Sequence, residues 1–75
     1  MEKLTEDQLI ELNTKIEEAH KKHKDWRMGQ TCFNVLYELY PNIANKLRGS
    51  SANPFYNNHK IGAFWQYLMQ HLYLL

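Results

Sequence analysis

The fold is decided by the stretch DWRMGQTCFNVLYELYP, residues 25–41. Asp25 is a residue type that caps helices, and Pro41 lacks the backbone N–H that would continue one, so the stretch predicts a helix from Asp25 to about Tyr40. At about 100° per residue, its apolar side chains fall on two sides of that helix. A helix that is apolar on two sides belongs at the centre of a bundle. One stripe comprises Trp26, Gly29, Phe33, Leu36, Tyr37 and Tyr40, the second comprises Met28, Cys32, Val35 and Leu39, and the remaining polar strip comprises Arg27, Thr31, Asn34 and Glu38.

Upstream of this central helix, the sequence predicts a helix with one buried side. Thr5 and Gln8 have the spacing of a capping box, in which each side chain accepts a hydrogen bond from the backbone of the other residue. The apolar residues that follow recur on one narrow face, and the charged residues lie outside it. The expected inner stripe comprises Leu9, Leu12, Ile16, Ala19, His20 and His23.

Downstream, the sequence predicts a short helix, a loop and a final helix. Pro41 suits the first position of a helix that runs from Asn42 to Arg48, and Gly49 suits the left-handed position that ends it. Residues 50–58 are rich in Ser, Asn and Pro, as loops are. The final helix is expected to begin near Asn57 or Asn58 and to run almost to the C-terminus. Its main stripe comprises Ile61, Phe64, Trp65, Leu68, Met69, Leu72 and Leu75, and a second side carries Ala63, Tyr67 and Leu74.

Together these segments predict an all-α fold, a single helical domain over residues 1–75. We expect a small bundle of three longer helices plus one short helix, with an ordered loop packed on the central helix. A single cysteine, Cys32, excludes an intramolecular disulfide and a zinc site built from paired cysteines, so helix packing must stabilise the fold. No signal peptide is recognised, and the apolar segment Ile61–Leu75 is too short to cross a membrane, so a cytoplasmic location is expected.

The polar residues of the central helix suggest how the loop is held. Gln30 and Asn34 lie one helical turn apart, beside a stripe predicted to be buried, where an unsatisfied polar group costs about 1–3 kcal/mol. A loop has backbone groups that need partners, so we expect Gln30 and Asn34 to anchor it, with Gly29 allowing close approach. In the alternative interpretation, these side chains form one recognition surface with Arg27, Phe55 and Tyr56.

The same region resembles a group of small, mostly uncharacterised phage and prophage proteins. Those proteins share a pattern of Trp-Arg-x-Gly-Gln, then Asn, then Gly, then Asp-Pro-Phe-Tyr. The group more often has Asp at the position of Asn53, so a role that needs a carboxylate there is not expected. The resemblance implies an origin in a mobile genetic element and no particular activity. The residues that carry the resemblance, over about the middle half of the sequence, are Asp25-Trp26-Arg27-Met28-Gly29-Gln30, Asn34, Arg48-Gly49 and Asn53-Pro54-Phe55-Tyr56.

Catalytic and metal-binding patterns are weak in this sequence. His20 and His23 have a spacing that allows two imidazoles on one metal, but a site needs further ligands, and Cys32, His59 and His71 lie at no favourable spacing. Cys32 is more typical of a small buried apolar residue than of a nucleophile. The sequence has no phosphate-binding loop and no serine elbow. We therefore expect no enzyme activity, no cofactor and no metal site.

The remaining interpretation is a protein that acts by binding. We expect a small phage-like accessory protein that binds another protein, for example to inhibit a host protein, or that associates with itself. The alternative is a nucleic-acid-binding regulator that uses the short third helix and the following loop, through Lys46, Arg48 and Lys60. Net charge is only +1, although residues 26–75 hold one acidic residue against four basic ones. The candidate partner-binding residues are Arg27, Phe55, Tyr56, Tyr67, Tyr73 and Leu74.

Overall fold

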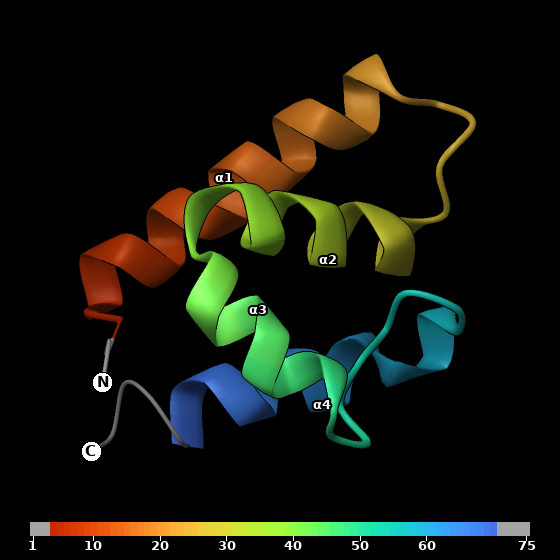
Figure 1. Cartoon of the computed structure of the whole chain (residues 1–75). Coiled ribbons are helices and arrows are strands. Elements are labelled where there is room, and N and C mark those ends of the chain that lie inside the picture. Colours follow the sequence, from red (N-terminus) through yellow and green to blue (C-terminus); the bar gives the residue numbers. More distant parts are fainter. Residues whose placement is uncertain (1–3, 71–75) are drawn as a thin grey trace.

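A computed structural model describes residues 4–70 of the protein. Its helices are α1 (Glu6–Lys22), α2 (Met28–Leu39), α3 (Pro41–Arg48) and α4 (Ile61–Leu68), and a short 3-10 helix, η1 (Asn58–Lys60), precedes α4. In Figure 1, α1 crosses α2, and α3 leads from the end of α2 toward α4. No strand occurs among the described residues. The all-α prediction is confirmed.

The finer prediction of three longer helices and one short one is not confirmed. Within the described part, α1 has 17 residues and α2 has 12, whereas α3 and α4 each have 8. The predicted continuation of the last helix past Gln70 lies outside the described residues, as do Leu72, Tyr73, Leu74 and Leu75.

The start of α1 confirms the predicted capping box. The Gln8 backbone N–H donates to Thr5 Oγ1 at 3.2 Å, and the Thr5 backbone N–H donates to Gln8 Oε1 at 2.9 Å. Such a box satisfies two N–H groups that would otherwise lack partners at a helix start. Because all its contacts are local, the sequence alone was enough to locate it.

The start of α2 was predicted wrongly. The helix begins at Met28 instead of after Asp25, and its N-cap residue is Arg27, with extended backbone at φ −69° and ψ 154°. Trp26 belongs instead to the connection between α1 and α2, where its ring stacks on that of His23, the C-cap residue of α1, with centroids 3.8 Å apart and planes at 10° to each other. The Trp26 backbone N–H also donates to the His23 carbonyl, which closes a turn. Trp26 therefore packs against the end of α1 and is not part of the α2 stripe.

The polar strip expected on α2 also differs from the prediction at Thr31. This residue is fully buried, and its hydroxyl donates to the Arg27 carbonyl at 3.0 Å. A threonine can satisfy its hydroxyl within its own helix, so its burial leaves no polar atom unpaired. By contrast, Tyr37 and Leu39 were assigned to apolar stripes but are exposed.

The predicted left-handed glycine at the end of α3 is wrong as well. Gly49 has φ −83° and ψ −1°, a right-handed conformation open to any residue. Ser50 closes this helix end instead, because its backbone N–H and its hydroxyl both donate to the Leu47 carbonyl, at 2.9 and 2.8 Å. The Ala52 backbone N–H in turn donates to the Ser50 hydroxyl oxygen at 3.1 Å.

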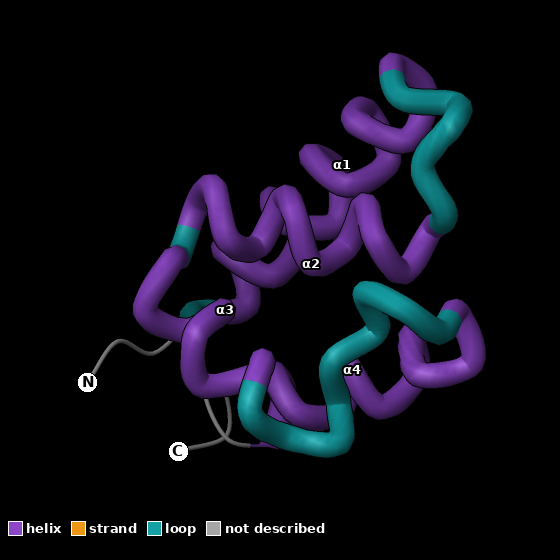
Figure 2. The backbone as a smooth tube through the Cα atoms, turned by 45° about the vertical axis from the view of Figure 1, so that its right-hand side comes forward, coloured by secondary structure: helices purple, strands orange, loops and turns teal. Residues whose placement is uncertain are grey.

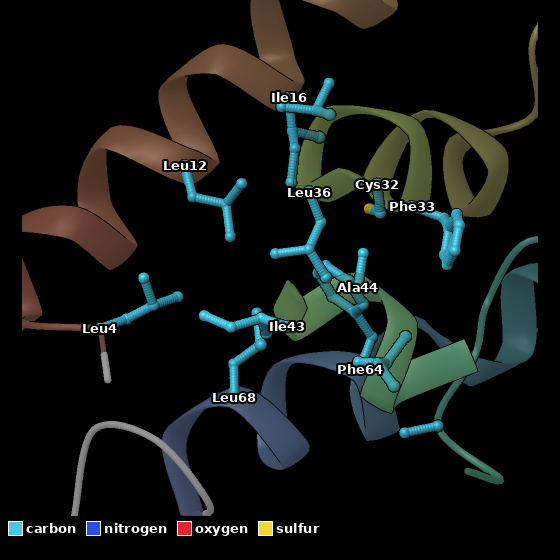
Figure 3. Packing of buried hydrophobic residues seen from close by; sticks show 13 residues of the cluster. Leu4, Leu12, Ile16, Cys32, Phe33, Leu36, Ile43, Ala44, Phe64 and Leu68 are labelled. Atoms are coloured by element: carbon cyan, nitrogen blue, oxygen red, sulfur yellow. The ribbon is translucent and has the colours of Figure 1, made fainter. Parts of the chain in front are cut away.

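The core lies where the four α-helices meet. In Figure 3, Leu36 of α2 lies at the centre, with Leu12 and Ile16 of α1 on one side and Ala44 of α3 and Phe64 of α4 on the other. Full burial of a Leu or Phe side chain contributes roughly 1.5–3 kcal/mol. The buried apolar residues are Leu4, Leu12, Ile16, Cys32, Phe33, Val35, Leu36, Ile43, Ala44, Leu47, Ala52, Phe64 and Leu68.

Candidate binding surface

The loop between α3 and η1, residues 49–57, runs along the N-terminal end of α2 (Figure 2). Arg27 Nη2 donates to the Phe55 carbonyl at 2.9 Å, and the Gly29 backbone N–H donates to Asn58 Oδ1 at 2.9 Å. A Cβ atom at Gly29 would overlap with the Pro54 carbonyl, so only glycine allows this approach. The loop is thus held to the helix by two long-range hydrogen bonds and one close backbone contact.

Asn58 serves as a cap for α2 although it lies far away in the sequence. The first N–H groups of a helix have no partner within the helix, and a side-chain oxygen from the preceding residue usually accepts from one of them. Arg27 occupies that position and makes no such bond. The Asn58 oxygen accepts from Gly29 instead, so a single amide both caps α2 and fixes the far end of the loop.

Hydrogen bonds inside the loop stabilise its turns. Asn53 Oδ1 accepts from the Phe55 backbone N–H at 3.0 Å, and the Pro54 carbonyl accepts from the Asn57 N–H at 3.1 Å. Asn57 Oδ1 accepts from the His59 N–H at 2.8 Å and so caps η1. These asparagines form the turns that this residue type favours.

Gln30 and Asn34 do not anchor the loop. Both side chains are half-buried, and neither hydrogen-bonds the loop within residues 4–70. The physical reason is the later start of α2. Because the helix begins at Met28, Arg27 stays outside it and can reach the loop, and the N–H left without a helical partner near the loop is that of Gly29.

Beside this loop lies a group of ring side chains with one guanidinium, which we call the arginine–aromatic surface. It comprises Phe33 and Tyr37 of α2, Arg48 of α3, and Phe55 and Tyr56 of the loop. The Phe55 ring stands edge-on to Phe33, with centroids 5.8 Å apart, and to Tyr56, at 4.7 Å. The Arg48 guanidinium carbon lies 5.4 Å from the Phe33 centroid and 5.5 Å from the Tyr37 centroid.

The arginine–aromatic surface is hollowed and partly open to solvent. A depression of about 350 Å³ is lined by Phe33, Arg48, Asn53, Phe55 and Tyr56. Tyr56 is 82% exposed and Tyr37 is 44% exposed, although the backbone beneath Tyr56 is fixed by the hydrogen bonds above. Tyrosine and arginine are among the side chains that most often concentrate binding energy in protein interfaces.

The charge of the arginine–aromatic surface is positive. Within residues 4–70, neither Arg27 nor Arg48 pairs with a carboxylate; the ion pair found there joins Lys15 and Glu18 on α1. Glu38 lines a different groove, between α1 and α2, with Lys15 and Leu39. Lys46 and Lys60, assigned above to nucleic-acid binding with Arg48, are exposed and do not line the depression.

A second open region is the α1–α4 groove, with a volume of about 420 Å³. Its floor and walls are almost entirely apolar. Ile10 is 59% exposed and Met69 is 46% exposed. Tyr67, predicted to bind a partner, is half-buried and packs against the core. The groove is lined by Glu6, Leu9, Ile10, Asn13, Trp65 and Met69.

Groups with chemical reactivity are poorly placed in the described part of the protein. Burial raises the pKa of the Cys32 thiol to about 11, so it is protonated at neutral pH and not a ready nucleophile. His20 is half-buried, with Nδ1 lacking a partner, whereas His23 is exposed and stacked on Trp26. No set of three His, Cys, Asp or Glu side chains suited to one metal ion occurs among residues 4–70.

Two residues of this region had no role in the sequence-based anchoring scheme. Asn58 was interpreted as part of a loop or helix start, and the contact of Arg48 with two rings was not foreseen.

Within residues 4–70, no helix has the length and apolar character needed to cross a bilayer. Comparison with known protein families, with curated proteins and with solved structures gave no match.

Proposed function

We propose that this protein is non-catalytic and works by binding another protein through the arginine–aromatic surface. The observation that carries the proposal is Tyr56, which is 82% exposed on a loop whose backbone is hydrogen-bonded at the neighbouring Phe55. A loop whose backbone is already hydrogen-bonded loses less conformational entropy when a partner covers it than a mobile loop does. An exposed aromatic ring on a hydrogen-bonded loop therefore supports a role in binding.

The composition of this surface supports a protein partner. Tyr and Arg are enriched at the centres of protein interfaces, where they supply large contact areas together with hydrogen-bond donors. The resemblance to small phage proteins suggests which partner this would be. We propose a protein in the cytoplasm of a bacterial host, which the binding would inhibit. The α1–α4 groove would provide a second contact, including contact with another copy of the protein.

The nucleic-acid alternative rests on Arg48, which lies in the same surface. Single-stranded nucleic acid needs stacking rings and a basic groove that follows several phosphates. The rings are present, but Lys46 and Lys60 do not line the depression. The two functions differ in salt dependence, because binding through phosphates weakens with a log–log slope of about −0.7 to −0.9 per contact.

Photo-crosslinking tests the proposal directly. A photoreactive phenylalanine analogue placed at Tyr56 is expected to capture a protein partner in cells, whereas the same group at exposed Glu11 on α1 is expected to capture none. The captured protein is then purified and its affinity for the wild-type protein and for Tyr56→Ala is measured. Equal capture at both positions, or equal affinity for the wild type and the variant, would contradict the proposal.

A further inference from the structure

Taking the proposed function as the basis, we infer that the arginine–aromatic surface binds an acidic peptide segment. The segment would carry one carboxylate, either from Asp or Glu or from the free C-terminus of the partner, next to an aromatic or large aliphatic side chain. The carboxylate would pair with Arg48, and the apolar side chain would enter the depression against Phe55 and Tyr56.

The guanidinium of Arg48 is presented for such a contact. Its carbon lies over two rings, Phe33 and Tyr37, and the guanidinium pairs with no carboxylate among residues 4–70. Stacking on aromatic faces orients a guanidinium while its edge, where the N–H donors lie, remains open. A carboxylate accepts two parallel hydrogen bonds from such a fork. The ring contacts thus hold the charged Arg48 guanidinium in position before a partner binds.

Charge complementarity favours an acidic segment over a neutral or basic one. Arg27 donates to the carbonyl of Phe55, a residue that lines the depression, and so adds a second positive charge beside this loop. Glu38 is the only acidic residue between positions 26 and 70, and it faces the groove between α1 and α2. No carboxylate from residues 4–70 lines the depression to compete for Arg48.

Asn53 sharpens this inference because it lines the depression as an amide. Its Oδ1 accepts from the Phe55 N–H, a bond that an aspartate oxygen would also make. Aspartate at this position would therefore keep the turn but place a negative charge beside Arg48, where it would repel an incoming carboxylate. The amide keeps the depression free of acidic groups.

A selection from displayed random peptides on the immobilised full-length protein tests the inference. Enriched peptides are expected to carry Asp, Glu or a free C-terminal carboxylate within two positions of an aromatic or large aliphatic residue. For a synthetic peptide of that kind, Arg48→Gln is expected to weaken binding about tenfold, since a charge-assisted hydrogen bond is lost. Arg48 is exposed, so this variant remains folded.

A matched pair of asparagine variants provides the control. Asn53→Asp is expected to weaken the same peptide about as much as Arg48→Gln does. Asn57→Asp adds the same charge in the same loop and keeps the bond to the His59 N–H, but Asn57 does not line the depression, so affinity should stay close to that of the wild type.

The inference is overturned if the enriched peptides are neutral or basic, if none is enriched, or if neither Arg48→Gln nor Asn53→Asp changes affinity. It is overturned in favour of nucleic acid if oligothymidylate binds more tightly than any selected peptide, with strong salt dependence. If a partner is captured at Tyr56 but the peptide selection enriches no acidic peptides, this inference fails and the proposed function still holds. If no partner were captured at Tyr56 and no acidic peptide were enriched, both the inference and the proposed function would be contradicted.

Discussion

The arginine–aromatic surface and the α1–α4 groove are both open, yet they are built in different ways. The first rests on a loop fixed by side-chain hydrogen bonds from Arg27, Asn53 and Asn58, and it presents rings around a cation. The second is a gap between two helices, lined mainly by the apolar side chains of Leu9, Ile10, Trp65 and Met69, with Glu6 and Asn13 beside them. Apolar contact has no preferred direction, whereas hydrogen bonds and ring geometry do. The first surface can therefore select a partner by shape and charge, whereas binding at the second depends mainly on how much apolar area is buried.

This difference predicts that substitution at the loop anchor has the largest effect. Gly29→Ala places a methyl group against the Pro54 carbonyl, and the backbone must move to accommodate it. Overpacking of this kind costs typically about 1–3 kcal/mol. Chemical denaturation followed by circular dichroism should show this loss of unfolding free energy, together with loss of binding at the arginine–aromatic surface.

Gly62→Ala is the matched control. Gly62 lies in α4, and a Cβ there meets nothing within 4 Å. Alanine in an exposed helical position is favoured over glycine by about 0.8–1 kcal/mol, so this variant should be more stable than the wild type. If Gly29→Ala were as stable as Gly62→Ala, the loop would not be held as described.

The second prediction concerns the cap that Asn58 provides. Asn58→Ala removes the acceptor of the Gly29 N–H and should lower the unfolding free energy by about 1 kcal/mol, as other lost caps do. Asn58→Asp keeps an acceptor, and a negative charge is favourable at a helix N-terminus, so stability should be retained. Hydrogen exchange at Gly29 should become faster in Asn58→Ala alone.

Asn57→Ala separates this long-range cap from a local one. Asn57 caps only η1, a helix of 3 residues, and it is exposed. Its replacement should cost less than that of its neighbour. Equal losses at both positions would mean that Asn58 acts through η1 and not through α2.

These anchors show which features of the fold the sequence alone can predict. The capping box of Thr5 and Gln8 and the break at Pro41 involve near neighbours, and local rules located them. At the start of α2, Trp26 lies in the connection after α1, where its ring stacks on that of His23 and its N–H closes a turn; the rules for helix caps and apolar stripes do not include such ring stacking. At the end of α3, the Ser50 hydroxyl replaces the expected left-handed Gly49, because two different groups can satisfy the same carbonyl.

The sequence predicted where the site lies but not which residues anchor its loop. The sequence predicted a loop with Phe55 and Tyr56 against the central helix at Gly29, and the loop and the helix meet there. Gln30 and Asn34 were expected to anchor it because polar residues on a buried face need partners. Which amide reaches the loop depends on where the helix begins and how the backbone returns to it. The N-cap of α2 is Arg27 and not Asp25, and with this shift of two residues the anchoring contacts come from Arg27 and Asn58.

The smallest expected effect is on the α1–α4 groove. Ile10 is more than half exposed, so Ile10→Glu should change the unfolding free energy by no more than about 0.5 kcal/mol. It should reduce binding of a hydrophobic dye and any concentration-dependent self-association, measured by sedimentation, because a charge in an apolar contact is costly to desolvate. Thr14→Glu, one turn further along α1 and not lining the groove, adds the same charge and should change neither property. Peptide binding at the arginine–aromatic surface should be equal in both variants. If Ile10→Glu abolished that binding, the two surfaces would be parts of one interface, and the contrast between a selective surface and a merely apolar one would fail.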